Sequence, residues 1–314
     1  MTSTTAAAPA GPVSAPRSRR AGSPRRSRDR RGWLFVAPFL IVFALTFLAP
    51  VAYAFGLSLF RDQAFFGGTT FVGLDNYAEV LADAKFWESF LRVLVFLLVQ
   101  VPVMLLLALI SALAIDSARL HASGFFRIVV FLPYAIPAVV AALMWGFLYG
   151  DNFGLAADLN HLVGHDIVHP LSGNWVLTSI GNVVTWEFTG YNMLIFYSAL
   201  RVIPGELFEA AAIDGAGAFR TIFAIKLPAL RGALVIATIF SIIGSFQLFN
   251  EPSILQTLAP NAISSFYTPN MYAYNLSFNG QQYNYSATVA IVMGVITAII
   301  AYAVQLRASR KEMQ

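Results

Sequence analysis

Long apolar runs recur along the whole length of this chain. Six runs of mainly apolar residues can be counted, near 33–59, 90–115, 128–149, 175–200, 232–254 and 287–306. About 20 apolar residues are what a helix needs to cross the hydrocarbon core of a bilayer. The composition agrees, because 58% of the residues are hydrophobic and only 11% are charged, against about 25% charged in ordinary soluble domains. The sequence therefore predicts an all-α, polytopic membrane protein with six transmembrane helices.

The positive charges predict how these helices are oriented. Eight of the 20 Lys and Arg residues lie between Arg17 and Arg31. If the N-terminus is inside, only Arg61, Lys85 and Arg92 fall on the outer side. Because Lys and Arg accumulate in cytoplasmic segments, both termini and the 201–231 loop are expected in the cytoplasm. A basic arm confined to one end also argues against a nucleic-acid-binding face.

Three regions are expected along the chain. Residues 1–31 contain Ala, Pro, Ser, Gly and Arg with little apolar bulk, which predicts a disordered, basic cytoplasmic tail. Residues 32–306 form the transmembrane domain, and 307–314 form a second cytoplasmic tail. Ala52-Tyr53-Ala54 resembles a signal-peptide cleavage site. The apolar run before it is longer than the ~7 to 15 residues of a signal-peptide core, so a retained first span is expected.

A polar, punctuated stretch interrupts the apolar pattern at about 205–228. Its core reads "FEAAAIDGAGAFRTIFAIKLP", from Phe208 to Pro228. Gly215 and Gly217 break a good helix-forming sequence, and Pro228 is expected to close it, which predicts two short helices around a bend. Two uses are open on periodicity alone. The stretch could dock to a cytoplasmic partner through Phe208, Phe219 and Phe223, or rest on the membrane surface.

The same stretch resembles a known signature. Glu209-Ala210-Ala211, Gly215 and Ile225-x-Leu227-Pro228 match the EAA loop of permease subunits of bacterial ABC importers. "FVGLDNYAEVLADAKFWESF" (71–90), "FLPYAIPAVVAALMWGFLYG" (131–150) and "YNMLIFYSALRVIPGELFEAAAIDGA" (191–216) resemble the sugar-permease branch, the maltose-type binding-protein-dependent systems. The resemblance covers roughly residues 33–306 and implies a type I ABC importer permease fold.

The resemblance implies a role for each residue of the loop. The loop would be the coupling helix that inserts into a cleft on the ATPase, with Glu209 facing that subunit. Ala210 and Ala211 would permit close approach, and Gly215 would make the turn. The ATPase-coupling residues expected in this way are Glu209, Ala210, Ala211, Asp214, Gly215, Ile225, Leu227 and Pro228. Glu209 and Gly215 also suit the two ends of a helix, and both roles can hold at once.

The chain lacks a nucleotide-binding motif of its own. It contains no Gly-Lys dipeptide, so a P-loop of the form GxxxxGK[ST] is excluded. The resemblance implies that energy arrives from two copies of a cytoplasmic ATP-binding subunit. It also implies a second homologous permease and an extracytoplasmic solute-binding protein. The chain is expected in the cytoplasmic membrane, in contact with lipid, without enzymatic activity or a cofactor.

Polar residues inside the apolar runs predict where a substrate passes. A charge at the centre of a membrane helix costs roughly 2.5 to 3.5 kcal/mol, so such residues indicate cavities or partners. Carboxylates and amides can bind sugar hydroxyls, and rings can cover a C–H face. The expected substrate-pathway residues are Glu187, Trp186, Tyr191, Asn192, Phe246, Gln247, Asn250 and Glu251. Structural roles are open, with Glu187 bonded to a neighbouring helix and Glu251 at the membrane interface before Pro252.

Two features of the sequence are compatible with functions other than carbohydrate import. His161, His165 and His169 recur every fourth residue, which would align metal ligands on one helical face. Gly164 and Pro170 disfavour a helix there, so an exposed loop without a metal is expected. The other alternative is an ion-gradient-driven secondary transporter with Glu187 as its proton-carrying site. The resemblance implies an oligosaccharide or disaccharide as the substrate, and no motif specifies one sugar.

Overall fold

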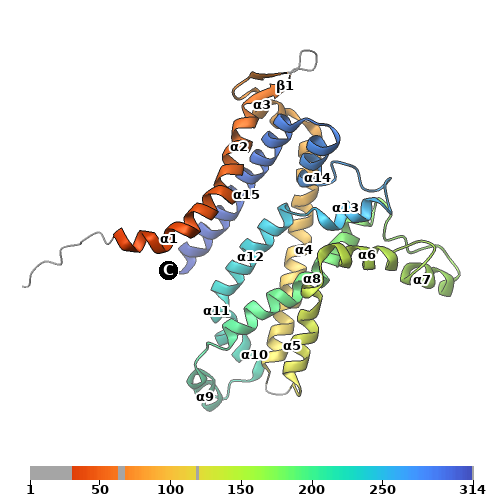
Figure 1. The fold of residues 1–314 in the computed structure, drawn as a ribbon. Coiled ribbons are helices and arrows are strands. Elements are labelled where there is room, and N and C mark those ends of the chain that lie inside the picture. The colour runs from red at the N-terminus through yellow and green to blue at the C-terminus, as the bar shows by residue number, and fades with distance from the viewer. Residues whose placement is uncertain (1–29, 63–67, 118–119, 313–314) are drawn as a thin grey trace, which may run out of the picture. The chain divides into compact units, whose positions relative to one another are not determined.

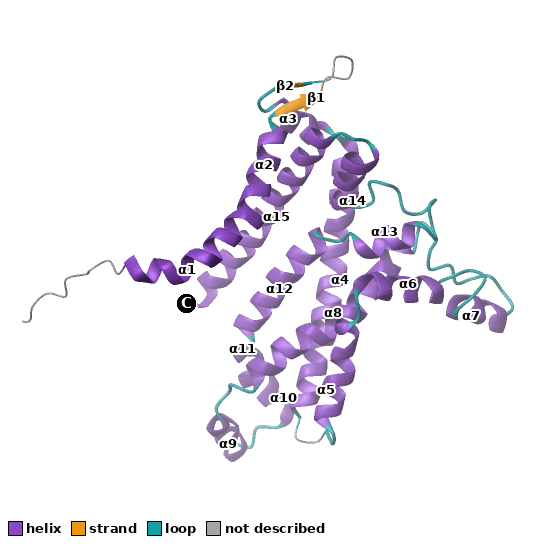
Figure 2. Ribbon diagram, in the orientation of Figure 1, coloured by secondary structure: helices purple, strands orange, loops and turns teal. Residues whose placement is uncertain are grey.

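The computed structural model describes residues 30–62, 68–117 and 120–312. The basic tail expected over 1–31 lies outside these residues except at its end, where the first helix begins at Arg30. The chain divides into two compact units, Met1–Pro50 and Val51–Gln314. Figure 2 shows that helices dominate the described chain.

A continuous helical run begins at Arg30, in the first unit, and ends at Ser58, beyond the unit boundary at Pro50. Helix α1 (Arg30–Phe43) continues into a π-helical turn, η1 (Ala44–Leu48), and then into α2 (Ala49–Ser58). The rings of Phe39, Phe43 and Phe47 stack along one side, because residues four apart face each other on a helix. Together Trp33–Ser58 is long and apolar enough to cross a membrane, as the sequence predicts.

A small polar element follows α2 and departs from the all-α expectation. Strand β1 (Phe60–Asp62) pairs antiparallel with β2 (Thr69–Phe71), and α3 (Asp75–Ala82) comes next. The buried Asn76 amide donates hydrogen bonds to the carbonyls of Ser58, at 2.9 Å, and Phe60, at 2.8 Å. The hairpin is only three residues deep, so the chain remains helical in character (Figure 2).

Two long helices form the centre of the second unit. Helix α4 (Ala84–Asp116) runs beside α8 (Val176–Leu200), with Ala108, Ala112 and Phe196 among the buried residues between them (Figure 1). Pro102 lies within α4 without ending it. Small alanines on α4 allow the two helices to approach closely, which is how membrane helices associate.

The third apolar run is a bent pair of helices. Helix α5 (Ser123–Phe131) and the 3-10 turn η2 (Leu132–Ala135) meet α6 (Ala138–Leu148) at an angle of 95°. Pro133 and Pro137 lie at the bend. Each proline removes a helical hydrogen bond and restricts the residue before it, and both effects favour a break in the helix here. Helix α7 (Leu155–Val163) follows.

The punctuated stretch forms two helical pieces around a bend, as its glycines predict. Helix α9 (Gly205–Ile213) is followed by α10 (Ala218–Thr221), η3 (Ile222–Lys226), α11 (Leu227–Ala229) and α12 (Arg231–Phe246). The expectation that Pro228 closes the stretch is wrong. The π-helical turn η3 precedes this proline, and the chain stays helical up to α12 because the wider turn changes the hydrogen-bonding partners ahead of it.

The last part of the chain contains α13, α14, η4 and α15. Their bounds are Asn250–Gln256, Pro269–Tyr274, Asn275–Asn279 and Tyr283–Glu312. Helix α15 therefore continues through most of the tail expected over 307–314, of which 313–314 lie outside the described residues.

Within the described residues, fewer helices pass a strict test of length and hydropathy than the six expected. Four pass alone, Trp33–Ser58, Ala84–Asp116, Arg231–Gln256 and Tyr283–Ala308, and the bent pair makes a fifth if it is one span. The run expected at 175–200 is α8, a single helix of 25 residues that is not among these candidates. The described residues thus contain four or five helices that are long and apolar enough to cross a membrane.

Candidate functional site

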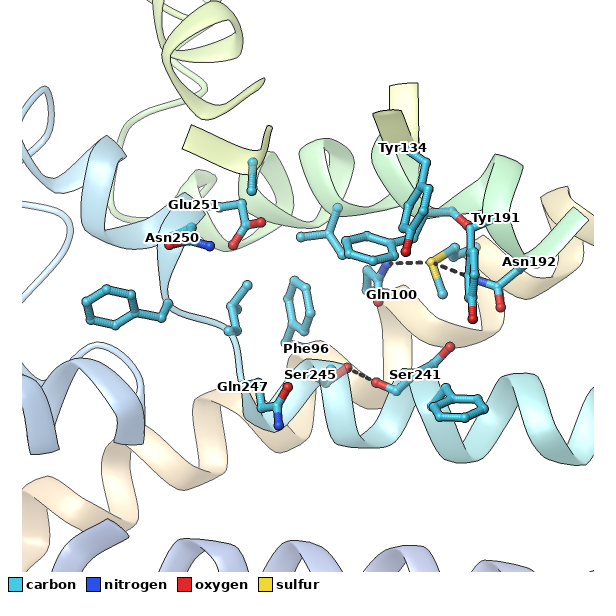
Figure 3. A pocket seen from close by; sticks show the side chains of 18 residues that line it. Phe96, Gln100, Tyr134, Tyr191, Asn192, Ser241, Ser245, Gln247, Asn250 and Glu251 are labelled. Atoms are coloured by element: carbon cyan, nitrogen blue, oxygen red, sulfur yellow. Dashed lines mark hydrogen bonds between the residues drawn. The ribbon is translucent and has the colours of Figure 1, made fainter. Parts of the chain in front are cut away.

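A cavity of about 350 Å³ lies among the central helices of the second unit. Its walls come from α4, the bend between α5 and α6, α8, α12 and the start of α13 (Figure 3). Its lining residues are Phe96, Gln100, Met104, Tyr134, Ala138, Val184, Phe188, Tyr191, Asn192, Phe240, Ser241, Gly244, Ser245, Gln247, Leu248, Phe249, Asn250 and Glu251. The cavity therefore combines aromatic rings with amides, hydroxyls and one carboxylate.

One end of the cavity is aromatic. The rings of Tyr134 and Tyr191 stack with centroids 4.8 Å apart, and Phe188 meets Tyr134 edge-on at 5.7 Å. Tyr134 reaches this position from η2, so the proline bend between α5 and α6 carries its ring to α8. Flat apolar faces beside polar groups suit a ligand with both C–H surfaces and hydroxyls.

The amides near this end are partly committed to the protein. Asn192 donates to the carbonyl of Phe188 at 3.0 Å, and Gln100 donates to the hydroxyl of Thr185 at 3.3 Å. Both amides also approach the Met104 sulfur (Figure 3). These bonds hold the two side chains in place, so their remaining polar atoms are preorganised rather than free to rotate.

The other end of the cavity is formed where a helix breaks. Helix α12 stops at Phe246 and α13 starts at Asn250, and Asn250 and Glu251 line this end (Figure 3). The break frees backbone carbonyls that α14 satisfies. Thr268 donates to the carbonyl of Leu248 at 2.9 Å, and Asn270 donates to that of Phe246 at 3.3 Å. Irregular backbone at membrane depth is tolerated only where protein satisfies it or a cavity adjoins it.

Five of the eight predicted substrate-pathway residues line the cavity, and three do not. Tyr191, Asn192, Gln247, Asn250 and Glu251 are among the lining residues. The ring of Phe246 is instead buried against Phe90, with centroids 5.4 Å apart. Trp186 packs edge-on against Trp145, at 5.7 Å. Their apolar rings are thus part of the packing between helices.

Glu187 lies outside the cavity wall. It directly precedes the lining residue Phe188, which places it about 100° further round α8. The residue is 4% exposed, and its Oε2 atom has no hydrogen-bond partner among the described residues. Glu251 is close enough to act on it electrostatically. The carboxyl group of Glu187 therefore affects the electrostatic potential of the cavity, although the residue does not line its wall.

The sequence reasoning missed Gln100, Thr268 and Asn270. Gln100 is the one amide in a long apolar run, which is a signal that could have been read. Thr268 and Asn270 lie in a polar segment with no distinguishing pattern. They matter because their side chains donate hydrogen bonds to carbonyls at the break between α12 and α13.

A second feature is the turn within the stretch 205–228. The N–H of Gly215 donates to the carbonyl of Ala212 and that of Ala216 to the carbonyl of Ala211, which is the Schellman arrangement at a helix end. It requires a left-handed residue, and Gly215 has φ +70°. The predicted role of Gly215 as the turn residue is thereby met by the backbone geometry.

The surface of this stretch is exposed and partly apolar. Of the predicted coupling residues, Glu209, Ala210, Asp214, Gly215 and Pro228 are exposed, and Ala211, Ile225 and Leu227 are half-buried. Ile213 and Phe219 are 87% and 80% exposed. An exposed apolar patch next to a carboxylate indicates a surface that contacts another molecule.

One ion pair ties this stretch to the central helices. Lys226 Nζ lies 2.6 Å from Asp116 Oδ2 at the end of α4, and both side chains are largely buried, at 15% and 11% exposure. Lys226 also lies over the ring of Phe208, 5.7 Å from its centroid. Phe208 thus packs within the stretch, whereas Phe219 and Phe223 remain exposed.

The histidines do not form a cluster. Helix α7 ends after Val163, and Gly164 has φ +75°, so His165 and His169 do not continue the helical face of His161. His169 hydrogen-bonds Asp151 at 3.2 Å, and this bond raises the pKa of the exposed imidazole. No group of three or more His, Cys, Asp or Glu side chains within the described ranges is arranged to hold a metal ion.

Comparisons with known proteins agree with the geometry. Residues 78–312 match the family model described as the inner membrane component of binding-protein-dependent transport systems. The lactose transport system permease protein LacF of Rhizobium radiobacter is 31% identical over 294 residues, covering 91% of this chain and 96% of that protein.

Solved structures share the fold. A bacterial ABC transporter involved in the import of the acidic polysaccharide alginate superposes with a TM-score of 0.77 at 19% identity, over 90% of this chain and 96% of that one. The alginate transporter in complex with its alginate pentasaccharide-bound periplasmic protein gives a TM-score of 0.75 at 20% identity, over 90% and 95%. The chain belongs to the family of binding-protein-dependent transport system inner membrane components, and is a multi-pass membrane transport subunit rather than an enzyme.

Proposed function

We propose that this protein is one transmembrane permease subunit of an ATP-driven ABC importer for a carbohydrate, an oligosaccharide or disaccharide. The observation that carries the proposal is the cavity, where the Tyr134 and Tyr191 rings lie opposite the polar groups of Asn250 and Glu251. Rings for C–H faces and polar groups for hydroxyls are what carbohydrate binding requires. The similarity to the lactose permease protein supports the substrate class.

The architecture proposed is six membrane spans with both termini in the cytoplasm. The sixth span would be α8, whose 25 residues give a length of about 38 Å, more than the ~30 Å hydrocarbon core. Its lower hydropathy has a physical reason, because its polar residues Asn192 and Glu187 are buried inside the protein rather than exposed to lipid. The excess of Lys and Arg on one side supports the orientation.

The energy for transport would come from two copies of a separate ATPase subunit, through the EAA loop. The exposed Glu209 and the turn at Gly215 would dock into the ATPase, and the ion pair of Lys226 with Asp116 would pass its motion to α4. The other partners would be a second homologous permease and an extracytoplasmic solute-binding protein. The solved alginate transporter, complexed with its periplasmic protein, supports the last of these.

Co-purification with the ATPase tests the coupling assignment. Glu209→Lys and Gly215→Asp should lose the ATPase from the purified complex and abolish sugar uptake, while the permease remains in the membrane. Gly217→Asp is the matched control. Gly217 has φ −70° and nothing within 4 Å of an added Cβ, so an Asp side chain fits at this position. The same side chain would strain the left-handed backbone of Gly215. Retention of the ATPase by both Glu209→Lys and Gly215→Asp would disprove the assignment.

The energy source separates this function from the alternative. The buried, unpartnered Oε2 of Glu187 is the feature that suits a proton carrier. Uptake into proteoliposomes that needs internal ATP and ignores a protonophore supports the importer. Uptake that follows the proton gradient without ATP, and is lost in Glu187→Gln, would favour a secondary transporter.

A further inference from the structure

The cavity wall contains an acidic side chain but no basic one. Among the lining residues, Glu251 is the only charged side chain, and none is Lys, Arg or His. Glu251 is 6% exposed, and the equally buried Glu187 lies behind the wall and within its electrostatic reach. A group that enters the cavity from water therefore meets the carboxyl group of Glu251, with that of Glu187 behind it, and no cation among the described residues of the wall.

Positive side chains near the cavity are engaged elsewhere. Arg92 lies one helical turn before Phe96 on α4, but its guanidinium donates to Glu88, at 2.6 Å, and to the carbonyl of Tyr267, at 2.9 Å. It also lies over the Tyr267 ring, 4.4 Å from the centroid. On the proposed cytoplasmic side, Lys226 is paired with Asp116. Neither cation is available to a ligand without breaking these contacts.

We infer that the cavity accepts neutral or amino-substituted carbohydrates and rejects acidic ones, an inference that rests on the proposed function of the cavity as a carbohydrate site. An acidic sugar must give up the water around its carboxylate, and burying a charge is unfavourable unless a counter-charge replaces that water. Here the wall offers none, and Glu251 adds repulsion that a low-dielectric site strengthens. A protonated amine would instead find a partner in Glu251.

The helix N-termini at the cavity do not supply enough positive charge to offset the carboxylate of Glu251. Helix α6 begins there, at Ala138, and a helix start carries roughly half a positive charge. Helix α13 also begins there, but Glu251 occupies its first turn and complements that end of the dipole. The full charge of a carboxylate outweighs a partial charge at a similar position.

Neutral hydroxyls have partners in the same wall. Gln247 and Asn250 are both exposed to the cavity, and neither amide is hydrogen-bonded to another side chain or carbonyl of the described chain. Each amide can donate and accept, as a sugar hydroxyl can. The stacked rings of Tyr134 and Tyr191 offer an apolar face at the opposite end. The relatives do not settle the charge, because lactose is neutral whereas alginate is acidic.

Direct binding to the purified complex of permeases and ATPases, without the solute-binding protein, tests the inference. Tritiated lactose, maltose, trehalose and cellobiose would each be compared, by equilibrium dialysis, with the analogue whose primary hydroxymethyl group is oxidised to a carboxylate and with the aminomethyl analogue. For the sugar that binds best, the carboxylate should bind at least tenfold more weakly, and the amine at least as tightly.

Four variants test the effect of charge in the cavity wall. Gln247→Lys places a cation at an exposed lining position and should raise the affinity for the carboxylate about tenfold, whereas Gln247→Met, of similar length, should keep the preference for the neutral sugar. Glu251→Gln should reduce the difference in binding affinity between the neutral and acidic sugars. Asn250→Asp should widen it, so the test does not depend on whether the buried Glu251 tolerates substitution.

Different binding results would contradict carbohydrate binding and the preference for neutral sugars. If neither the neutral, acidic nor amino forms of these sugars bind, the carbohydrate function itself is contradicted. If the acidic form binds as tightly as the neutral form, or more tightly, the charge inference is wrong while the carbohydrate function stands.

Discussion

Asp83 connects three helices through one carboxylate. It caps the start of α4 by accepting from the N–H of Lys85 at 2.9 Å, and its Oδ2 atom accepts from the hydroxyls of Tyr272 on α14 and Tyr285 on α15. Partial burial acts to raise the pKa of Asp83. These hydrogen bonds, with one from the backbone of Phe86, outweigh that effect and lower the pKa of Asp83 from its ordinary value.

The lowered pKa predicts acid sensitivity. A carboxyl group whose pKa is lower in the folded state adds stability above its unfolded pKa, and this stability is lost as pH falls through the folded pKa. The thermal midpoint of the detergent-solubilised protein should therefore fall as pH drops below about 4. Asp83→Asn retains a capping amide but has no charge, so this part of the acid sensitivity should disappear.

Removing the side chain should have a larger effect than removing its charge. Asp83→Ala loses the helix cap and both tyrosine bonds, at a cost of roughly 2 to 4 kcal/mol in the free energy of unfolding. Tyr272→Phe and Tyr285→Phe, alone and with Asp83→Ala, form a double-mutant cycle that isolates each bond. Additive effects in the cycle would show that the tyrosines do not act through Asp83.

At the scale of elements, helices α5 and α8 approach each other very closely at Gly190. A Cβ atom there would lie 2.0 Å from the carbonyl oxygen of Val130 and 2.7 Å from Phe131 Cα, both on α5. Backbone atoms of a helix cannot move aside as a flexible side chain can. The absence of a side chain at Gly190 is therefore what lets α5 carry the proline bend, and Tyr134 with it, against α8.

Substituting this glycine should separate the two helices. Gly190→Ala is expected to destabilise the protein by about 1 to 3 kcal/mol, the usual cost of overpacking, and to weaken sugar binding by displacing Tyr134. Gly181→Ala, on the same helix, is the matched control, because its Cβ would meet Gln100 at an ordinary 3.7 Å. Thermal unfolding of both variants checks the prediction, and equal midpoints would contradict it.

The ion pair of Lys226 with Asp116 links the stretch 205–228 to α4. Both side chains are largely buried, so removing one partner leaves a charge without compensation. Asp116→Ala and Lys226→Ala should each increase the ATP hydrolysed per sugar transported, because the loop can then move without α4.

Exchange of the two charges provides the control. The double variant Asp116→Lys with Lys226→Asp restores a pair of opposite charges, so the ratio of ATP to sugar should return toward the wild-type value. A merely stabilising pair would change the amount of folded complex but not this ratio. An unchanged ratio in both single variants would exclude a coupling role.

At the scale of the whole molecule, the orientation in the membrane can be measured with single cysteines. The chain contains no cysteine, so each introduced thiol reports alone. Leu162→Cys, 87% exposed after the bent helices, should react with a membrane-impermeant maleimide in intact cells. Gly217→Cys, exposed between α9 and α10, should react only after the membrane is permeabilised.

The reverse labelling pattern would overturn the proposed orientation. It would also remove the stretch 205–228 from the side on which an ATPase can bind. Labelling of both positions in intact cells would instead indicate an even number of spans between them, and so a different span count from the six proposed.

Much of the element order could be read from the sequence. The apolar runs near 33–59, 90–115 and 287–306 correspond to long helices, and Gly215 was identified as the turn of the polar stretch. The span at 128–149 was found, but its 95° bend was not, because two prolines allow a kink without setting its angle. Pro228 was misread as a stop, because a π-helical turn keeps the chain helical there.

The sequence by itself determined that the chain is a helical membrane protein with a punctuated polar loop, because the length of each apolar run and the glycines of the loop are local properties. Only the tertiary structure decided which side of each helix faces the cavity. The hydropathy pattern of a largely apolar membrane helix does not show which of its sides faces the cavity, so Phe246 and Glu187 could not be distinguished from Tyr191 and Glu251. The pairing of Thr268 and Asn270 with the carbonyls freed between α12 and α13 also joins residues about 20 positions apart, and only the packing of α14 brings them together.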